Sequence, residues 1–217
     1  MAKTITVKGI GKVSATPDYI VLSVSLEASS KIYEAALAEA AEKTERLGEA
    51  LAEAGFAKDC LKTTNFDVHA DYKRKRQSDD SYHQVFSAYV VRHDLKIAFD
   101  FDSARLSKAL SALSACLAHP QLNVAFTVKD AESLKEAMLR AATLNAKRQA
   151  DILCDAAGVA LAELINIEYN WGELDIYSRT GFHMADECLS APMLKSIELN
   201  PDDIDISDSV TFTWAIV

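Results

Sequence analysis

Strand-like stretches in this sequence come in neighbouring pairs. Residues 3–12 and 19–27 both alternate apolar and polar side chains, and we expect the two strands to be joined at Thr16-Pro17-Asp18. Stretches 61–72 and 85–99 flank a polar segment, residues 73–83, which we expect to be the tip of a long hairpin. Parallel neighbours need a crossover of about a dozen residues or more, so these pairs favour antiparallel hairpins and disfavour a wholly parallel sheet.

Helical patterns alternate with these strands. The expected caps and ends of three helices are Ser29-Ser30 with Gly55, Asp102 with His119-Pro120, and Asp130 with Gly158. The apolar residues of the third helix include Leu134, Met138, Ala141, Leu144, Ile152 and Ala156.

Three shorter stretches, residues 123–128, 164–169 and 209–217, also have strand character. Gly9 and Gly11 interrupt the first strand and indicate a bulge or a close backbone approach. This order of elements predicts an α+β fold, with long β hairpins in antiparallel sheets and three main helices packed on the sheet.

The size and charge of the chain bound its organisation and partners. A chain of 217 residues can bury about 70% of its surface, so it needs neither metal nor disulfide to fold. We expect one domain over residues 1–217, or two intertwined α+β halves of about 1–100 and 101–217. With 32 acidic residues against 23 basic ones, the net charge of -9 argues against sequence-independent nucleic-acid binding.

The N-terminal segment has no apolar core of a signal peptide, and no stretch is long and apolar enough for a membrane helix. The sequence as written therefore predicts a cytoplasmic protein, or an exported one if a leader has been removed. The four cysteines show no zinc-like spacing, and the expectation is that they are reduced and structural.

Oppositely charged segments form the main candidate site. The basic residues lie at the expected hairpin tip, and the acidic residues lie on the expected solvent face of the first helix. A contact between one subunit's tip and its neighbour's helix would set orientation and association rate more than affinity. A phosphate-binding role for the tip is the weaker interpretation, because four cations release few counterions. The residues proposed for the subunit contact are Lys73, Arg74, Lys75, Arg76, Glu42, Glu45 and Glu49.

Other candidate sites are weaker. Tyr169, Trp171 and Tyr177 could line a pocket or an interface, or simply pack in the irregular loop 170–190. The same loop holds His183, Met184 and Cys188, which could bind a soft metal.

Further residue groups argue against metal or catalytic chemistry. His69 and His93 are expected to face residues near Ser87 and Thr63, too far apart along the ladder to share a metal. The aspartates after Pro201 lack the glycine and terminal glutamate of a calcium loop. Neither a nucleophile elbow nor a phosphate-binding glycine loop is present, so no catalytic residue is assigned.

Several segments together resemble the SIMPL domain family (DUF541) over nearly the whole chain. The matching segments are Ile5-Thr6-Val7-Lys8-Gly9-Ile10-Gly11-Lys12-Val13 with Pro17-Asp18, Asp59-Cys60-Leu61-Lys62-Thr63-Thr64-Asn65-Phe66, Ala88-Tyr89-Val90-Val91-Arg92-His93-Asp94-Leu95, and Ala146-Lys147-Arg148-Gln149-Ala150 through Ala156-Ala157-Gly158-Val159. Ala88 and His93 stand where the family usually has Gly and Asn.

The resemblance implies little chemistry. The family includes exported bacterial proteins linked to oxidative-stress defence, a surface antigen that looks like a ring or channel-like oligomer, and an animal protein that binds a signalling kinase. We therefore expect a non-enzymatic, self-associating protein with a stress-protection or assembly role, without a cofactor. It would form a homo-oligomer, with an unknown protein partner as a further option. The alternative is a small-molecule or metal-binding protein that uses loop 170–190.

Overall fold

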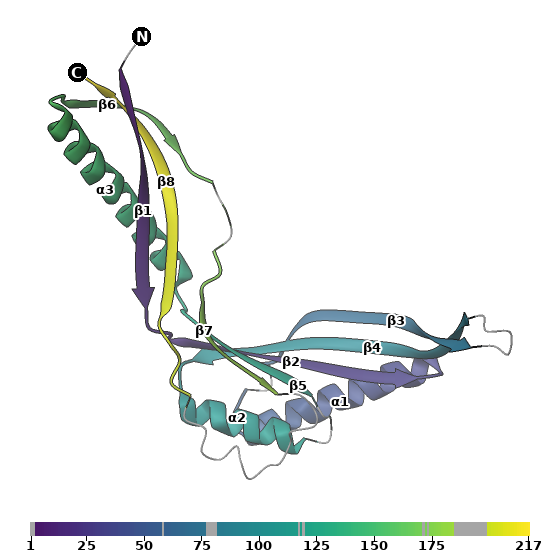
Figure 1. The fold of residues 1–217 in the computed structure, drawn as a ribbon. Helices are drawn as coiled ribbons and strands as arrows, with labels where there is room; N and C mark the ends of the chain where they lie inside the picture. Colours follow the sequence, from purple (N-terminus) through teal and green to yellow (C-terminus); the bar gives the residue numbers. More distant parts are fainter. Residues whose placement is uncertain are drawn as a thin grey trace. The chain divides into compact units, whose positions relative to one another are not determined.

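The computed structural model describes residues 3–57, 59–76, 82–116, 118, 120–170, 172, 174–184 and 199–217 (Figure 1). It confirms an α+β fold in which antiparallel sheets combine with three helices. The elements are β1 (Thr4–Ala15), β2 (Tyr19–Ser30), α1 (Tyr33–Glu53), β3 (Lys62–Arg76), β4 (Tyr82–Asp100), α2 (Ser103–Ala115), β5 (Gln121–Thr127), α3 (Ala131–Ala157), β6 (Leu161–Glu168), β7 (Tyr177–Met184) and β8 (Ile204–Ile216).

Contacts divide the chain into two compact units. The first, here the small-sheet unit, contains residues 1–18, 127–179 and 201–217. Its sheet has the strand order β1-β8-β6. The second, the large-sheet unit, contains residues 19–126 and 180–200, and its sheet has the order β3-β4-β2-β5-β7.

The first two strands do not form the expected pair. β1 pairs along its whole length with β8, from Thr4 opposite Ala215 to Ala15 opposite Ile204. β2 belongs to the other sheet and pairs with β4. The short segment between β1 and β2 therefore does not close a hairpin. Asp18 instead contacts the end of β5, where its N–H donates to the Thr127 carbonyl at 3.1 Å.

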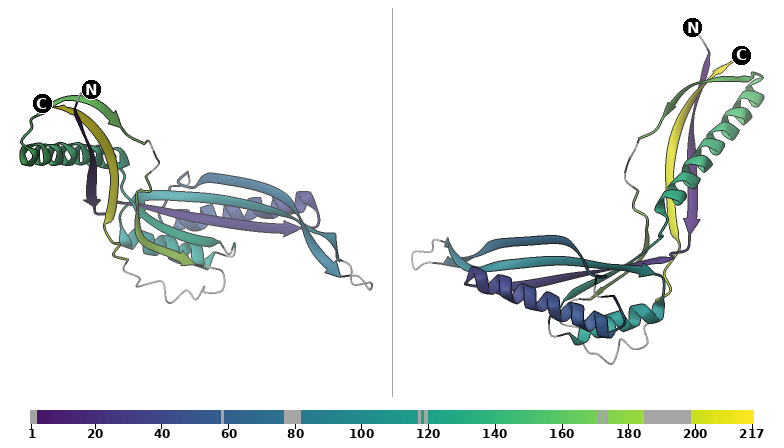
Figure 2. Two further views of the ribbon diagram at one scale, coloured as in Figure 1. Left: turned by 45° about the horizontal axis from the view of Figure 1, so that its top comes forward. Right: turned by 180° about the vertical axis from the view of Figure 1, so that it is seen from behind.

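Close packing of α3 against β1 explains the two glycines of that strand. A Cβ added at Gly9 would lie 2.1 Å from the carbonyl oxygen of Ala142, and one at Gly11 would lie 2.1 Å from that of Met138. Close backbone approach, one of the two predicted reasons for these glycines, is thus confirmed. Figure 2 shows α3 running along β1 and β8 in the small-sheet unit.

Several large apolar residues of α3 are exposed, and most of its buried face is formed by small residues. Leu144 is 69% exposed and Ile152 is 55% exposed. The helix approaches its sheet so closely that small side chains are needed at the contact, and these recur every four residues. The buried residues of α3 are Met138, Ala142, Ala146, Ala150 and Cys154. Periodicity that favours large apolar residues misses an alanine stripe of this kind.

The caps of the helices agree with the predictions except at the start of α1 and the end of α2. Asp102 and Asp130 accept hydrogen bonds from the N–H groups of Arg105 and Ser133, each at 3.0 Å. Before α1, however, β2 continues through Ser30, and the N-cap is Ile32 without a side-chain cap. The expected end of α2 at His119 falls outside the described residues, and the helix itself ends at Ala115.

The core of the large-sheet unit lies between its sheet and helices α1 and α2. Leu47 and Leu51 of α1 and Leu110 of α2 are buried against β2, β4 and β5. Side chains of a strand alternate between the two faces of the sheet. Val24 and Leu95 accordingly point to the helices, while their neighbours in sequence point to the opposite face, where the polar cluster described below lies.

Candidate functional site: the hairpin ribbon and the polar cluster

The far end of the β3–β4 hairpin is a two-stranded ribbon. Ser30, the last residue of β2, is opposite Tyr89 of β4, so residues 82–88 pair only with β3 in the described structure. We call residues 71–76 and 82–88 the ribbon. An isolated two-stranded hairpin is at best marginally stable in water, so a ribbon of this kind gains from further contacts.

The ribbon corrects the predicted tip. Residues 73–76 and 82–83 lie in strands, not in the tip, and Arg76 is opposite Tyr82. His69 is opposite Val90 and His93 is opposite Phe66, whereas the predicted partners were near Ser87 and Thr63. The difference arises because the register of the hairpin is centred later in the sequence than Ser78 and shifts after Asp71. Residues 77–81 and the side chain of Arg76 fall outside the described residues.

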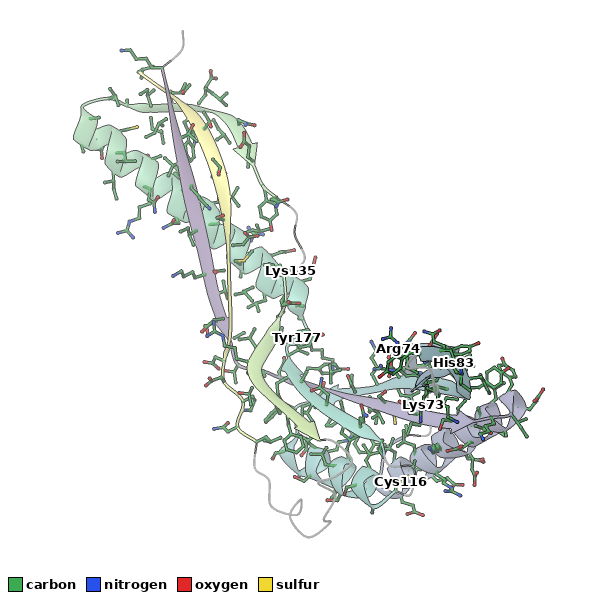
Figure 3. The ribbon with its side chains drawn as sticks, turned by 45° about the vertical axis from the view of Figure 1, so that its right-hand side comes forward. Lys73, Arg74, His83, Cys116, Lys135 and Tyr177 are labelled. Carbon is green, nitrogen blue, oxygen red and sulfur yellow. The ribbon has the colours of Figure 1, made fainter. Side chains whose placement is uncertain are left out.

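The basic residues of the ribbon point into solvent. Lys73, Arg74 and Lys75 are exposed, and none of them forms an ion pair with another described residue. Figure 3 shows the labelled side chains of Lys73, Arg74 and His83 together at the hairpin. The ribbon is therefore a cationic projection from a chain of net charge -9.

A row of aromatic rings runs from the start of α1 onto the ribbon. The ring centroids are 5.6 Å apart between Tyr33 and Tyr89, 5.0 Å between Tyr89 and Phe86, and 6.0 Å between Phe86 and Tyr72. Such pairs contribute about 0.5–1.5 kcal/mol beyond burial. Tyr72 nevertheless stays 54% exposed, so the row presents apolar surface beside the cations.

The predicted acidic face of α1 is exposed. Glu42, Glu45 and Glu49 are spaced three and four residues apart, which places them on one side of the helix. Glu42 forms an ion pair with Arg46, at 2.5 Å. Glu45 and Glu49 have no ion pair to another described residue, so no described cation neutralises them.

Of the three predicted aromatic residues, Tyr169 and Tyr177 are described, and their surroundings differ. Tyr169 packs against the core of the small-sheet unit and donates a hydrogen bond to Asp208 at 3.0 Å. Desolvation, followed by the hydrogen bond and charge of Asp208, raises the pKa of Tyr169. Tyr177 begins β7 and is 52% exposed, and Trp171 falls outside the described residues.

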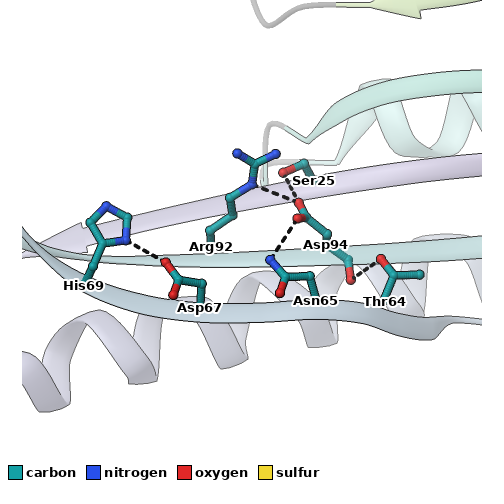
Figure 4. Close-up of polar contacts among 7 residues, drawn as sticks. All are labelled: Ser25, Thr64, Asn65, Asp67, His69, Arg92 and Asp94. Atoms are coloured by element: carbon teal, nitrogen blue, oxygen red, sulfur yellow. Dashed lines mark hydrogen bonds and ion pairs between the residues drawn. The ribbon is translucent and has the colours of Figure 1, made fainter.

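Sequence reasoning missed a polar cluster on the face of the large sheet opposite α1 and α2 (Figure 4). Asp94 of β4 accepts hydrogen bonds from Ser25 at 2.5 Å, from Arg92 at 3.1 Å and from Asn65 at 3.3 Å. Its backbone carbonyl accepts a fourth from Thr64 at 3.0 Å. These bonds join β2, β3 and β4, so the carboxylate fixes the three strands to one another.

The hydrogen bonds also hold Asp94 ionised. Burial alone acts to raise its pKa, but the bonds from Ser25, Arg92 and Asn65 outweigh that effect, and the pKa lies below its ordinary value. An open hollow of about 550 Å³ lies beside the cluster. Asp94 itself lines the hollow, and the other polar lining residues are Ser23, Ser25, Thr64, Arg92, Gln121 and Asn123. The sequence signal that could have revealed this cluster is the recurrence of polar residues at every second position of strands that are otherwise apolar.

His93 lies on the helix-facing side of the same strand. The Thr44 hydroxyl donates to the Ala40 carbonyl at 2.8 Å, so we assign the proton of the ring to Nδ1, 3.1 Å from that hydroxyl. Nε2 then accepts from Thr63, at 2.9 Å. Burial lowers the pKa of His93, although the charge of Asp94 acts in the opposite direction. With both ring nitrogens engaged, His93 has none free for a metal.

Metal ligands do not gather elsewhere in the described part of the chain. No group of three or more His, Cys, Asp or Glu residues there could hold an ion. His69 is bonded instead to Asp67, at 2.7 Å. The predicted loop ligands His183, Met184 and Cys188 fall outside what the structure describes, at least in their side chains. Cys60, Cys116 and Cys154 are free thiols.

Comparison with protein families gives a match over almost all of this architecture. The model described as SIMPL, protein of unknown function (DUF541), matches residues 5–214. The chain belongs to the SIMPL family. No curated protein matches it. Among the described residues, no helix is long and apolar enough to cross a membrane.

The segments that resemble SIMPL sequences can now be located in the structure. Residues 88–95, with the Tyr-Val-Val pattern, are the part of β4 that contains Asp94, and the Ala-rich segment from residue 146 is the part of α3 that packs on β1. His93, which stands where SIMPL sequences usually have Asn, is the residue bonded to Thr44 and Thr63. These positions set packing and strand register, which explains why the motifs indicate a fold but no reaction.

Proposed function

We propose that this SIMPL-family protein is a non-enzymatic scaffold that self-associates by placing the ribbon of one subunit on the acidic face of α1 of another. The observation that supports the proposal best is the ribbon itself. It extends beyond β2, exposes aromatic rings and presents Lys73, Arg74 and Lys75 without described ion-pair partners. Exposed apolar surface bordered by charge is typical of interaction sites.

Charge complementarity supports a second copy of the chain as the partner. The protein is acidic overall, and Glu45 and Glu49 on α1 have no described ion-pair partner. A cationic ribbon would be attracted to such a helix and repelled by another ribbon. The contact joins two different surfaces, so it is heterologous unless a two-fold axis makes it reciprocal. Electrostatic attraction would set the rate and orientation of docking, and the aromatic row would supply apolar burial.

Charge reversal tests the contact. The ribbon variant Lys73→Glu/Arg74→Glu/Lys75→Glu should have a lower average mass than the unmodified protein in size exclusion coupled to light scattering at micromolar concentration. A matched control reverses three exposed cations of α3, Arg140, Lys147 and Arg148, and should keep the mass unchanged. An equal loss in both variants would show that net charge, not the ribbon, controls association.

A complementary variant makes the test specific. Glu42→Lys/Glu45→Lys/Glu49→Lys reverses the helix face and should lower the mass in the same way. Mixing the ribbon variant with the helix variant should restore association, since each supplies the charge that its partner now needs. A mixture that stays as dissociated as its components would contradict the proposed pairing of the two surfaces.

A further inference from the structure

The two edges of the small sheet differ in how they are protected. At the β1 edge, the N–H of Ile10 donates to the Asn145 side chain of α3 at 2.9 Å, and α3 packs tightly at Gly9 and Gly11. β6 forms the other edge. In the described structure, no backbone hydrogen bond reaches its outer side, so one edge of the sheet is covered and the other is open.

The open edge is apolar as well as unpaired. Leu164 is 46% exposed, Ile165 is 51% exposed and Ile167 is 53% exposed. Leu164 and Ile167 of β6 are opposite Trp214 and Phe212 of β8, which are buried against α3. The two β6 residues are therefore on the face of the sheet that α3 covers, but α3 makes few contacts with β6 itself. Protected edges commonly bear lysine or proline. β6 has neither, although its register against β8 shifts twice.

We propose that β6 is a second self-association site, at which two copies of the chain pair their β6 strands antiparallel across a two-fold axis. This contact uses residues of the small-sheet unit and does not depend on the ribbon contact. The backbone of an edge strand supplies the hydrogen bonds, and the exposed apolar residues supply the burial. The two surfaces are the same on both copies, so the contact closes as a dimer.

The charges of β6 favour the antiparallel arrangement. Residues directly opposite each other in an antiparallel pair lie on the same face of the sheet. With the axis at Leu164, this residue faces its own copy, and Leu161 faces Ile167, which is on the same face. Glu163 then faces Ile165 and Glu168 faces Ala160, so no like charges are opposite. A parallel, in-register pairing would place each glutamate opposite its own copy, which is unfavourable.

A substitution at the centre of the strand tests the pairing. Leu164→Lys should abolish it, because the lysines of the two copies would face each other at the two-fold axis. Leu153→Lys on α3 is the matched control, with the same substitution at a similarly exposed leucine of the same unit, and it should change nothing. Circular dichroism checks that both variants keep the native fold. If Leu164→Lys perturbs folding, Ile167→Lys replaces it.

Mass and hydrogen exchange then separate this contact from the ribbon contact. In the ribbon variant background, β6 pairing predicts a dimer of twice the 23.7 kDa chain mass, and adding Leu164→Lys should give the monomer. Amides of β6 should exchange more slowly as protein concentration rises, and this dependence should vanish with Leu164→Lys. A monomer in the ribbon background with concentration-independent exchange in β6 would overturn the proposal while leaving the ribbon contact intact.

Discussion

Replacing Gly9 with alanine should destabilise the small-sheet unit strongly. The added Cβ would lie 2.1 Å from the Ala142 carbonyl oxygen and 2.6 Å from the Ala146 Cβ, whereas real Cβ contacts are essentially never shorter than 3.0 Å. The obstacle is helix backbone, so no side-chain rotation relieves it, and α3 must move away from β1. Overpacking typically costs about 1–3 kcal/mol, and we expect about 3 kcal/mol because backbone must shift.

Gly48 provides a control of opposite sign. It lies inside α1, and an added Cβ there would have no atom within 4 Å. Gly48→Ala should therefore stabilise the protein by up to about 1 kcal/mol through helix propensity alone. The two substitutions add the same methyl group, so the difference between them measures the space at each position.

Urea unfolding followed by tryptophan fluorescence measures both effects. Trp214 is buried against α3 in the core of the small-sheet unit and reports on that unit. A Trp171→Phe background makes Trp214 the only tryptophan. Gly9→Ala should lower the unfolding midpoint seen by Trp214, and Gly48→Ala should raise the midpoint seen by far-ultraviolet circular dichroism. A Gly9→Ala protein within about 0.5 kcal/mol of its parent, the range of neutral surface changes, would refute the close packing.

Three further predictions concern side chains within single units. Met138→Ala, in the buried stripe of α3, should lower the free energy of unfolding in urea by about 2–5 kcal/mol, whereas Leu144→Ala, at an exposed site, should lower it by less than about 0.5 kcal/mol. Equal losses would contradict the assignment of Met138 to the buried face and of Leu144 to the exposed face. Asp94→Ala should cost about 2 kcal/mol at pH 7, because hydrogen bonds to a charged group are lost. Since the folded pKa of Asp94 is lowered, its contribution is lost as pH falls below the ordinary value of 3.8, so the gap between variant and parent should narrow there. The pKa of His93 in the folded protein is also lowered, so protonation favours the unfolded state, and the free energy of unfolding should decline as pH falls below 6.5. His93→Asn should remove that part of the pH dependence. A profile of unfolding free energy against pH that is unchanged in the variant would exclude His93 as its source.

The sequence predicted elements better than their partners. Alternation located β2, β3, β4 and β8, and aspartate caps located the starts of α2 and α3. The pairing of β1 with β8 joins the two ends of the chain, which local patterns cannot reveal. The alanine stripe of α3 was missed because close helix–sheet packing selects small residues, whereas hydrophobic periodicity gives most weight to large ones.

The candidate site was predictable only in part. The positions of the charged residues in the sequence were enough to locate the basic segment and the acidic helix face. Its aromatic row depends on a register shift next to Asp71 and on contact with α1, which are tertiary features. The Asp94 cluster was missed for a similar reason, since its donors come from three strands that are distant in sequence.

Mixing the two charge-reversed variants tests the central proposal most directly. The ribbon variant and the helix variant are each measured alone and then at equal concentration, by size exclusion coupled to light scattering at low and high salt. The proposed ribbon–helix contact predicts that each variant alone has a reduced mass and that the mixture regains the parent mass at low salt, with a loss as salt rises. A mixture with no more mass than its components, or a parent protein that is monomeric at 23.7 kDa throughout, would contradict the proposal.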